Sequence, residues 1–460
     1  MERTPGPPAR QLARRIVRQR QDPLRLFSGL VATYGDVVRY RLAGHDFYIL
    51  RRPEHVEHIF VSNQGKYAKS FQYRLLAIGL GEGLLTSGGE RWARQRRLIQ
   101  PMFAKRHLDV FAGPMTAAAT DALAGWKNVP DGGRLDVAAA MNKMTLDVVG
   151  RALFGADLTE AAVRIGPALT VVLRGAIQAA RLVVLAPGVL SYGTPLMERM
   201  PGRWFKRLRD SLGELDAVVA ELIDVRHGAA EPGDDLLGLL LTARDPETGR
   251  GMSRCQIRDE LMTFLLAGHE TTANALNWTW YLLSLHVEAR RRLLAEVTEV
   301  PDGRIPTAGD VERLVWTNAV VSEAMRLYPP AWILQRQATE DDEIDGHHVP
   351  AGSLVTVPPY LVHRHPDVWP NPEGFDPERF MPGADEGRHR LAYIPFGAGR
   401  RICVGAGFAR LEAVLLTAMI AQRCTFDLLP GARIRPEATV TLRPRDGLPM
   451  TLHWREPPGI

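Results

Sequence analysis

One long helical segment dominates the middle of the sequence. It begins at Ser253, where Ser253 and Gln256 have the spacing of a capping box, and no proline follows before Pro301. Its middle, ELMTFLLAGHETTANALNW, is apolar on nearly every face, and a helix that is apolar all round is buried. We therefore expect a buried helix within a region, from about 90 to 300, whose pattern is mainly helical.

A short polar run, Gly268 to Thr272, interrupts this apolar helix. Glycine inside a helix costs up to ~1 kcal/mol relative to alanine, and a buried carboxylate such as that of Glu270 costs several kcal/mol unless it is partnered. Such local penalties often mark a functional bulge. The alternative is a kinked core helix whose threonine hydroxyls bond back to the helix carbonyls. These residues alone leave both interpretations open.

The flanking regions have different patterns. Residues 36–61 alternate as strands do and contain Gly44 between the two runs, so a hairpin of two antiparallel strands is predicted there. Residues 330–400 are rich in Pro, Gly, His and Asp, which predicts long ordered loops of the kind that are usually functional. A final helix is expected just after Cys403, followed by a tail with short strand signals.

Composition excludes several classes of protein. The net charge of +5 comes mainly from scattered arginines and includes no lysine block, so nucleic-acid binding is not expected. No run of eighteen apolar residues occurs, so no membrane span is predicted. The first residues lack the apolar stretch of a signal peptide, and three cysteines form no disulfide framework or zinc motif. These features favour a cytoplasmic protein.

Cys403 is set in a frame that the other two cysteines lack. In Phe396-Gly-Ala-Gly-Arg-Arg-Ile-Cys403-Val-Gly405, the glycines let the backbone turn sharply and lie close to a flat ligand. The helix expected after Cys403 would favour its thiolate through free amides and the helix dipole, whereas Cys255 and Cys424 are interpreted as inert. The segment FGAGRRICVG resembles the haem-binding signature of the cytochrome P-450 family at each defining position.

The resemblance implies roles for particular residues. Cys403 would be the axial ligand of the iron of haem b, because a thiolate ligand helps to cleave the O–O bond. Glu270 and Thr271 would line the oxygen site and relay protons. The resemblance further implies a structural network of Glu323, Arg326 and Arg379, cofactor-binding side chains at Phe396, Trp92, Arg96, Arg336 and Arg401, and a substrate-pocket wall that includes Ala267, Ala331, Trp332 and Ile333.

The same resemblance covers nearly the whole chain and implies its fold and activity. We expect a single domain over 1–460 that is mainly α with a smaller β-rich lobe, an N-terminal arm to about residue 25 and no fused reductase. The activity implied is the insertion of one oxygen atom of O2 into a lipophilic terpene, steroid or fatty-acid-like substrate. Apolar stretches at 70–85 and 171–196 would lie over its pocket. A peroxygenase and a haem-based sensor are the alternatives.

Electrons would come from a separate ferredoxin or flavodoxin-type donor with its NAD(P)H reductase. Such carriers are usually acidic, and the resemblance places the helix around Trp92 on the side that faces the partner. Arg91, Arg94 and Arg97, together with Lys105 and Arg106 further along, are therefore expected to form a basic docking face.

Overall fold

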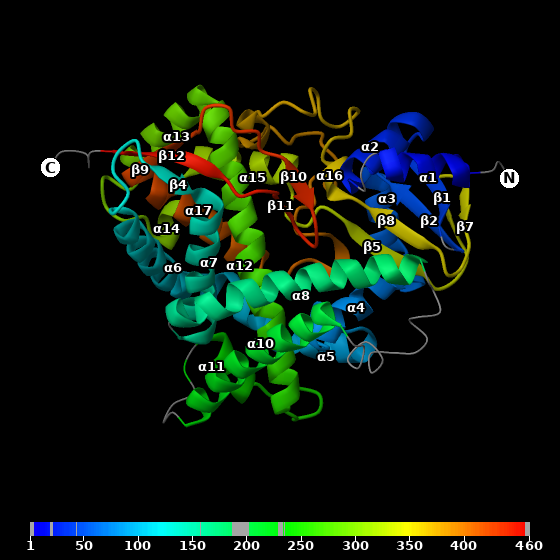
Figure 1. Cartoon of the computed structure of the whole chain (residues 1–460), viewed down its shortest axis with the longest axis horizontal. Coiled ribbons are helices and arrows are strands. Elements are labelled where there is room, and N and C mark those ends of the chain that lie inside the picture. The colour runs from blue at the N-terminus through cyan, green and yellow to red at the C-terminus, as the bar shows by residue number, and fades with distance from the viewer. Residues whose placement is uncertain are drawn as a thin grey trace.

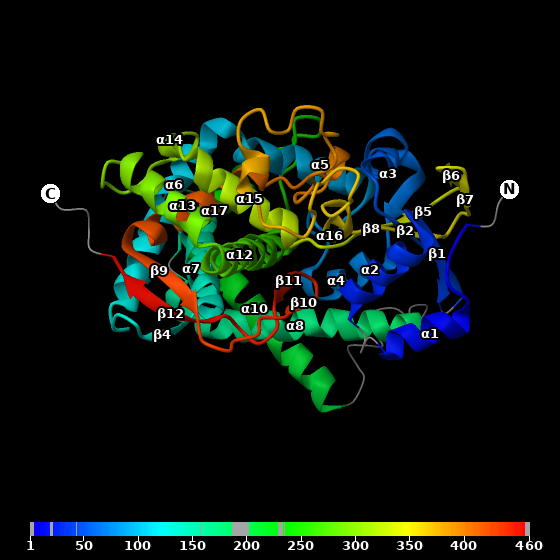
Figure 2. The same cartoon turned by 90° about the horizontal axis from the view of Figure 1, so that it is seen from above.

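Helix α12 (Arg254–Leu285) runs through the middle of the molecule, with helices around it and a β-rich lobe to one side (Figures 1 and 2). The computed structural model describes residues 4–18, 22–42, 44–156, 158–185, 202–228, 233 and 235–455. The other helices are α1 (Ala9–Arg18), α2 (Pro23–Tyr34), α3 (Pro53–Glu57), α4 (Phe71–Leu80), α5 (Gly89–Ile99), α6 (Lys105–Trp126), α7 (Val137–Phe154), α8 (Thr159–Leu185), α10 (Arg203–His227), α11 (Leu236–Thr242), α13 (Val287–Glu299), α14 (Ala308–Val311), α15 (Val315–Leu327), α16 (Pro359–Val362) and α17 (Ala406–Arg423). The predicted class, mainly α with a smaller β lobe, is confirmed.

The start and the burial of α12 agree with the sequence-based prediction. Ser253 Oγ accepts a hydrogen bond from the Gln256 backbone N–H at 3.3 Å, and Gln256 Oε1 accepts one from the Ser253 N–H at 2.9 Å. Trp278 and Trp280 are among the largest fully buried side chains of the described residues. The helix packs on α7, α15 and α17 and therefore forms the centre of the main hydrophobic core.

The bulge that we considered at Gly268 is absent, because α12 is a continuous α-helix from Arg254 to Leu285. Thr271 Oγ1 donates to the Ala267 carbonyl at 2.6 Å, and Thr272 Oγ1 donates to the Gly268 carbonyl at 3.3 Å. A Cβ atom at Gly268 would lie 2.8 Å from a methyl of Val149 on α7. The glycine therefore permits close packing of two helices, and the threonines satisfy their hydroxyls locally.

The β-rich lobe is built on a five-stranded mixed sheet in the order β1-β2-β8-β5-β3. The predicted hairpin is present, with Val37 of β1 opposite Leu50 of β2. The region expected to be loops between 330 and 400 in fact supplies two of the five strands. The strands of the chain are β1 (Val37–Leu42), β2 (His45–Leu50), β3 (Tyr67–Lys69), β4 (Arg134–Asp136), β5 (Leu334–Ala338), β6 (Asp342–Ile344), β7 (His347–Val349), β8 (Leu354–Val357), β9 (Cys424–Leu428), β10 (Pro436–Ala438), β11 (Leu442–Pro444) and β12 (Pro449–Trp454).

The N-terminal arm is not an independent extension. Its helix α1 lies against β1 of the sheet, and Leu12 is buried among Leu30, Val38 and Ile49. Asp22 caps the next helix, since its Oδ1 accepts hydrogen bonds from the Leu24 and Arg25 N–H groups. The first helices are therefore part of the β-rich lobe.

A buried ion pair on α15 organises the loops that follow the sheet. Arg326 and Glu323 are both fully buried, and their two hydrogen bonds measure 2.6 and 2.8 Å. The remaining donors of the Arg326 guanidinium reach the backbone carbonyls of His363, Pro372 and Gly374 at 2.7–2.9 Å. Arg379 Nε lies 3.5 Å from Glu323 Oε1. The structure thus brings together the three residues that the sequence suggested.

His363 connects this ion pair to the cysteine loop, a role that the sequence did not reveal. Its Nε2 accepts a hydrogen bond from the Ile394 N–H at 2.8 Å, and its Nδ1 lies 3.2 Å from the Arg326 carbonyl. Burial, together with the positive charge of Arg326, lowers the pKa of His363 to about 3. The ring is therefore neutral, as an acceptor at Nε2 requires. The two ring nitrogens of His363 therefore link the Arg326 carbonyl at the end of α15 to the backbone of Ile394.

Replacing Glu323 by alanine should leave the Arg326 charge buried without its partner. Breaking a buried pair typically costs ~3–5 kcal/mol, so Glu323→Ala should lower the unfolding midpoint strongly and reduce haem-loaded protein. Glu288→Ala is the matched control, because Glu288 and Arg291 have the same helical spacing but are exposed. Thermal unfolding of both variants measures the difference, and equal melting temperatures would contradict a stabilising role for the buried pair.

Candidate functional site

The loop that carries Cys403 is closed by its own backbone. The Gly397 N–H donates to the Ile394 carbonyl at 3.0 Å, and the Cys403 N–H donates to the Phe396 carbonyl at 2.9 Å. Arg96 on α5 donates to the Ile402 carbonyl at 2.8 Å, so a second element fixes the loop. Cys403 is exposed, which leaves its sulfur accessible to a ligand.

Two of the three glycines are required by the backbone. Gly397 has φ +75° and Gly399 has φ +69°, a region that favours glycine. A Cβ at Gly399 would also lie 1.7 Å from the Phe60 carbonyl oxygen. Gly405 differs, because its φ is −90° and the nearest atom to a Cβ there is a ring carbon of Phe103 at 3.8 Å. The turn itself does not require Gly405, and its small size leaves room beside Cys403.

The electrostatics at Cys403 combine opposing effects. The surrounding protein removes much of the solvation of the thiol, although the residue is open to a ligand, and this desolvation raises the pKa of Cys403. A hydrogen bond from the Gly405 backbone and the charge of Arg96 act in the opposite direction. The helix start therefore favours the thiolate as predicted, but desolvation outweighs it in the protein alone. A cation bound at the sulfur would reverse that balance.

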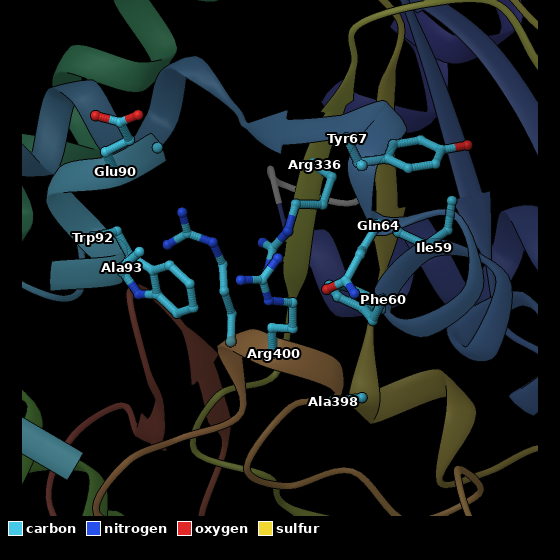
Figure 3. Close-up of a pocket in the computed structure, with 13 residues that line it drawn as sticks. Ile59, Phe60, Gln64, Tyr67, Glu90, Trp92, Ala93, Arg336, Ala398 and Arg400 are labelled. Carbon is cyan, nitrogen blue, oxygen red and sulfur yellow. The ribbon is translucent and has the colours of Figure 1, made fainter. Parts of the chain in front are cut away.

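A basic cavity lies above this loop. It has a volume of about 440 Å³ and is lined by Phe60, Trp92, Arg336, Arg400 and Arg401, among others. Figure 3 shows Trp92 on one side of the cavity and Phe60 with Gln64 on the other, with the Arg336 side chain between them. The Arg401 guanidinium lies 4.2 Å from the centre of the Trp92 ring, and the Arg336 guanidinium lies 4.8 Å from that of Phe60.

Lys69 adds a further basic side chain that the sequence analysis missed. Desolvation, together with the positive charges of Arg401 and Arg336, lowers the pKa of Lys69 to about 6. Its Nζ donates to the Leu84 carbonyl at 3.4 Å and also reaches the Leu85 carbonyl. Within the described residues no carboxylate lies in ion-pair distance of Lys69, Arg336 or Arg401, although the charge of Glu260 acts to raise the pKa of Lys69. The only sequence signal for Lys69 is a charge that directly precedes the apolar stretch from 70 to 85.

The middle of α12 is buried except on one face. Between Leu261 and Trp280, the half-buried residues are Ala267, Gly268 and Thr271, which share a side of the helix by their spacing. Glu270 lies about 100° away from Thr271 around the helix. Its Oε1 accepts a hydrogen bond from Thr441 Oγ1 at 2.9 Å, and desolvation raises its pKa. The two predicted relay residues are therefore adjacent in sequence, but their side chains leave the helix in different directions.

The predicted pocket wall is only partly supported by the positions of its residues. Trp332 is 5% exposed and packs with Leu24 and Leu442, and its Nε1 donates to the Thr439 carbonyl at 2.9 Å. Its ring is therefore a core element, which corrects our expectation of a wall residue. Ala331 and Ile333 are half-buried and remain candidates for the wall. Of the stretch 171–196, residues 186–196 lie outside the described part of the chain.

Comparison with known proteins agrees with this geometry. Residues 5–448 match the family model described as Cytochrome P450. The chain belongs to the cytochrome P450 family. Cyclooctatin synthase of Streptomyces melanosporofaciens is 37% identical over 443 residues, 95% of this chain and 93% of that protein. Pentalenene oxygenase of Streptomyces avermitilis is 32% identical over 436 residues, 95% and 94% of the two chains.

A solved structure shares the whole P450 architecture. The crystal structure of the cytochrome P450DA heme domain superposes with a TM-score of 0.88 at 28% identity and covers 99% of both chains. The family makes this protein a haem-iron monooxygenase. None of the helices in the described part of the chain is long and apolar enough to cross a membrane.

The residues of this site fit a haem. An accessible sulfur lies on a glycine loop at the base of the site. The cavity above it holds several guanidinium groups that form no ion pair with a carboxylate in the described part of the chain, although Glu90 is also in the lining. The two propionates of a haem are the anions that such donors bind in bidentate fashion. A haem bound here would have Cys403 as the ligand of its iron. Arg336, Arg401 and Trp92 would lie on its propionate side with Lys69 nearby, and Arg96, whose guanidinium here bonds to the Ile402 carbonyl, is the further predicted propionate ligand. Phe396 contributes through its carbonyl, which accepts the Cys403 N–H.

If Cys403 is the iron ligand, Cys403→Ser should abolish the red-shifted Soret band of the reduced, carbon-monoxide-bound protein, because a hydroxyl does not replace a thiolate donor. Cys255→Ser and Cys424→Ala are the controls. Cys255 is exposed and distant from the loop in the sequence, and Cys424 is buried in the core. An unchanged band in the Cys403 variant would refute the assignment.

Proposed function

We propose that this P450 uses haem b and O2 to hydroxylate a lipophilic terpene-like substrate, with electrons from a separate ferredoxin-type or flavodoxin-type donor. The observation that carries the proposal is the open face of α12, where Thr271 is half-buried in an otherwise buried apolar helix, within a chain whose cysteine loop fits a haem. The haem supplies oxygen activation when it is bound. The protein must supply position, a dry site and protons.

The substrate class is supported by the pocket and by the relatives. Ala267 and Gly268 offer no polar side chain on the face shared with Thr271, so the surface there suits an apolar skeleton. Cyclooctatin synthase and pentalenene oxygenase act in terpene oxidation, and each matches 95% of this chain. A panel of cyclic terpenes, steroids and fatty acids, each tested for a shift of the haem spin state, would identify the class. No shift with any terpene would contradict the proposal.

Thr271 and Glu270 are the residues that we assign to proton delivery. The Thr271 hydroxyl donates to the Ala267 carbonyl, which leaves its oxygen free to accept a hydrogen bond in the site. Glu270 has a raised pKa because it is desolvated, so it can exchange a proton nearer to neutral pH than an ordinary glutamate. Thr271 would hold a proton donor near the oxygen, and Glu270 would replenish it.

The expected basic docking face is more neutral than the sequence suggested. Arg91 pairs with Glu82, and Arg94 and Arg97 lie 3.2 and 3.3 Å from Asp245. Lys105 pairs with Glu312 at 2.7 Å, and the Arg106 side chain lies outside the described part of the structure. Next to Cys403, Arg400 is exposed and Ile402 is 43% exposed. We therefore propose that the donor docks at the cysteine loop itself, with a smaller electrostatic contribution than first expected.

The cysteines support an intracellular location. Cys255, Cys403 and Cys424 are the three cysteines of the chain, and all are free. Free cysteines are typical of a reducing compartment. We propose the cytoplasm, where NAD(P)H and a reductase are available.

Removing the Thr271 hydroxyl should separate electron flow from product formation. Thr271→Ala should bind haem and substrate normally, but the step that needs the proton should slow by ~10²–10⁴-fold, so that NAD(P)H oxidation yields hydrogen peroxide. Thr279→Ala is a matched control, because Thr279 Oγ1 makes the same bond to the carbonyl four residues back and is buried away from the open face. Product and peroxide per NAD(P)H are measured, and full coupling in Thr271→Ala would disprove its role.

A further inference from the structure

The loop between α4 and α5, residues 81–88, is bonded to the first turns of α12. The Glu82 N–H donates to Asp259 Oδ2 and the Leu84 N–H donates to Glu260 Oε2, each at 2.9 Å. Two N–H groups of one loop therefore end on two successive carboxyl groups of one helix. Hydrogen bonds of this length are directional, so the two bonds together fix how the loop lies on the helix.

The backbone of this loop approaches α12 too closely to leave room for side chains at two of its positions. A Cβ at Gly81 would lie 1.9 Å from Asp259 Oδ1, and a Cβ at Gly83 would lie 2.3 Å from Thr263 Oγ1. Gly81 also has φ +71°, a region that favours glycine. The contact between the loop and the helix therefore depends on glycine at both positions.

The loop meets α12 on the side of its open face. Glu260, Ala267 and Thr271 are seven and four residues apart, which places them within about 40° of one another around the helix. Glu260 precedes Ala267 by about 10 Å along the axis, at 1.5 Å per residue. Leu84 and Leu85 of the loop are half-buried and pack against the main core. The loop therefore covers one end of the face on which we place the substrate.

Basic side chains of the haem site hold the other edge of the loop. Lys69 Nζ donates to the Leu84 carbonyl at 3.4 Å and also reaches the Leu85 carbonyl. Arg401 Nη1 donates to the Ser87 carbonyl at 3.2 Å. Leu84 is thus bonded to α12 through its N–H and to Lys69 through its carbonyl. The loop therefore bridges the space between the basic cavity and the open face of α12.

The contact also buries two oxygen atoms of α12 that have no partner in the described part of the chain. They are Glu260 Oε1 and Thr263 Oγ1, on residues that are 0% and 4% exposed. Desolvation raises the pKa of Glu260 to about 7, although the Leu84 N–H and two nearby cations act in the opposite direction. Unsatisfied buried polar groups destabilise a structure, and both oxygens would be hydrated if the loop moved away. The closed position is therefore opposed as well as supported, which suits a loop that opens and closes.

We propose that Asp259 and Glu260 form a latch that holds loop 81–88 closed over the bound substrate and sets how fast the substrate leaves. The inference rests on the proposed function, because it takes the open face of α12 as the substrate site. It assigns both acids as positioning residues, which act through the backbone of the loop and do not touch the reacting atoms.

Gly83→Ala tests the latch from the loop side. The added methyl would collide with Thr263 Oγ1 and with the Asp259 carbonyl oxygen, so the loop must move off α12. The probe is 4-phenylimidazole, whose ring nitrogen binds haem iron at the axial position that Cys403 leaves free. Its dissociation, followed by the Soret shift, should become at least about tenfold faster, the factor expected for losing one hydrogen bond to a carboxylate. Gly88→Ala is the matched control, because a Cβ there meets no atom within 4 Å and φ is −138°.

Replacing the acceptor tests the latch from the helix side. Glu260→Met cannot accept the Leu84 N–H and should speed dissociation as Gly83→Ala does, whereas Glu260→Gln keeps an acceptor oxygen and should retain the parent rate. With an oxidised substrate, Glu260→Met should raise KM while kcat stays within about twofold, since only binding is weakened.

Glu296→Met controls for the loss of a carboxylate that accepts backbone N–H groups elsewhere in the fold. Glu296 accepts the Trp316 and Thr317 N–H groups at 2.7 and 2.8 Å. This variant should lower the unfolding midpoint and leave the dissociation of the azole unchanged. Gly83→Ala leaves every side chain of α12 in place, so it decides the question if Glu260→Met does not fold.

Amide hydrogen exchange measures the latch without ligand or turnover. In the haem-loaded protein, the Leu84 amide should exchange at least about tenfold faster in Glu260→Met than in Glu260→Gln. Equal exchange would show that the bond does not hold the loop, and faster exchange with unchanged azole dissociation would show that the loop does not cover the site. Either result, or equal acceleration of dissociation by Gly88→Ala, overturns the latch. If no terpene is oxidised, the proposed function fails, while exchange and azole dissociation still decide the latch.

Discussion

The pairing of Arg326 with Glu323 is the interaction on which the position of Cys403 depends. Burying a guanidinium costs several kcal/mol unless its donors are satisfied, and here they reach one carboxylate and three carbonyls. Because those carbonyls belong to residues 363–374, the pair fixes the segment that leads to the cysteine loop. His363 in turn accepts a hydrogen bond from the Ile394 N–H, and so links the pair to a residue three positions before the first glycine of the loop.

Most of the structural features that could be predicted from the sequence depend on local patterns of residues. The capping box at Ser253, the hairpin at Val37–Leu50 and the helix after Cys403 depend on residues near each other in the chain, and all are present. The family motif identified Cys403 because its glycines impose one backbone shape. Lys69, His363 and Thr441 were missed because their roles arise from distant contacts; Thr441 meets Glu270 across 171 residues. Trp332 was misplaced because an apolar side chain suits a core as well as a pocket wall.

Helix α12 has different chemistry on two neighbouring faces. The face with Ala267, Gly268 and Thr271 is small and nearly apolar, which suits a dry reaction site. The flank with Glu270, Asn274 and Asn277 is polar and lines a cavity of about 610 Å³ toward α7 and α8. A single continuous helix can separate these environments because its threonines satisfy their hydroxyls within the helix and Gly268 lets α7 seal its flank.

The cluster of Lys69, Arg336 and Arg401 has a consequence for how the protein is made. Arg336 and Arg401 repel a charge on Lys69, and this repulsion adds to the larger effect of desolvation in lowering the pKa of Lys69 to about 6, against the attraction of Glu260. A ligand that brings two negative charges relieves this repulsion only in the folded chain. Haem therefore acts as a thermodynamic partner in folding, since a ligand that binds the native state alone stabilises it by mass action. The supply of free haem in the cell then helps to set how much of the newly made chain escapes proteolysis.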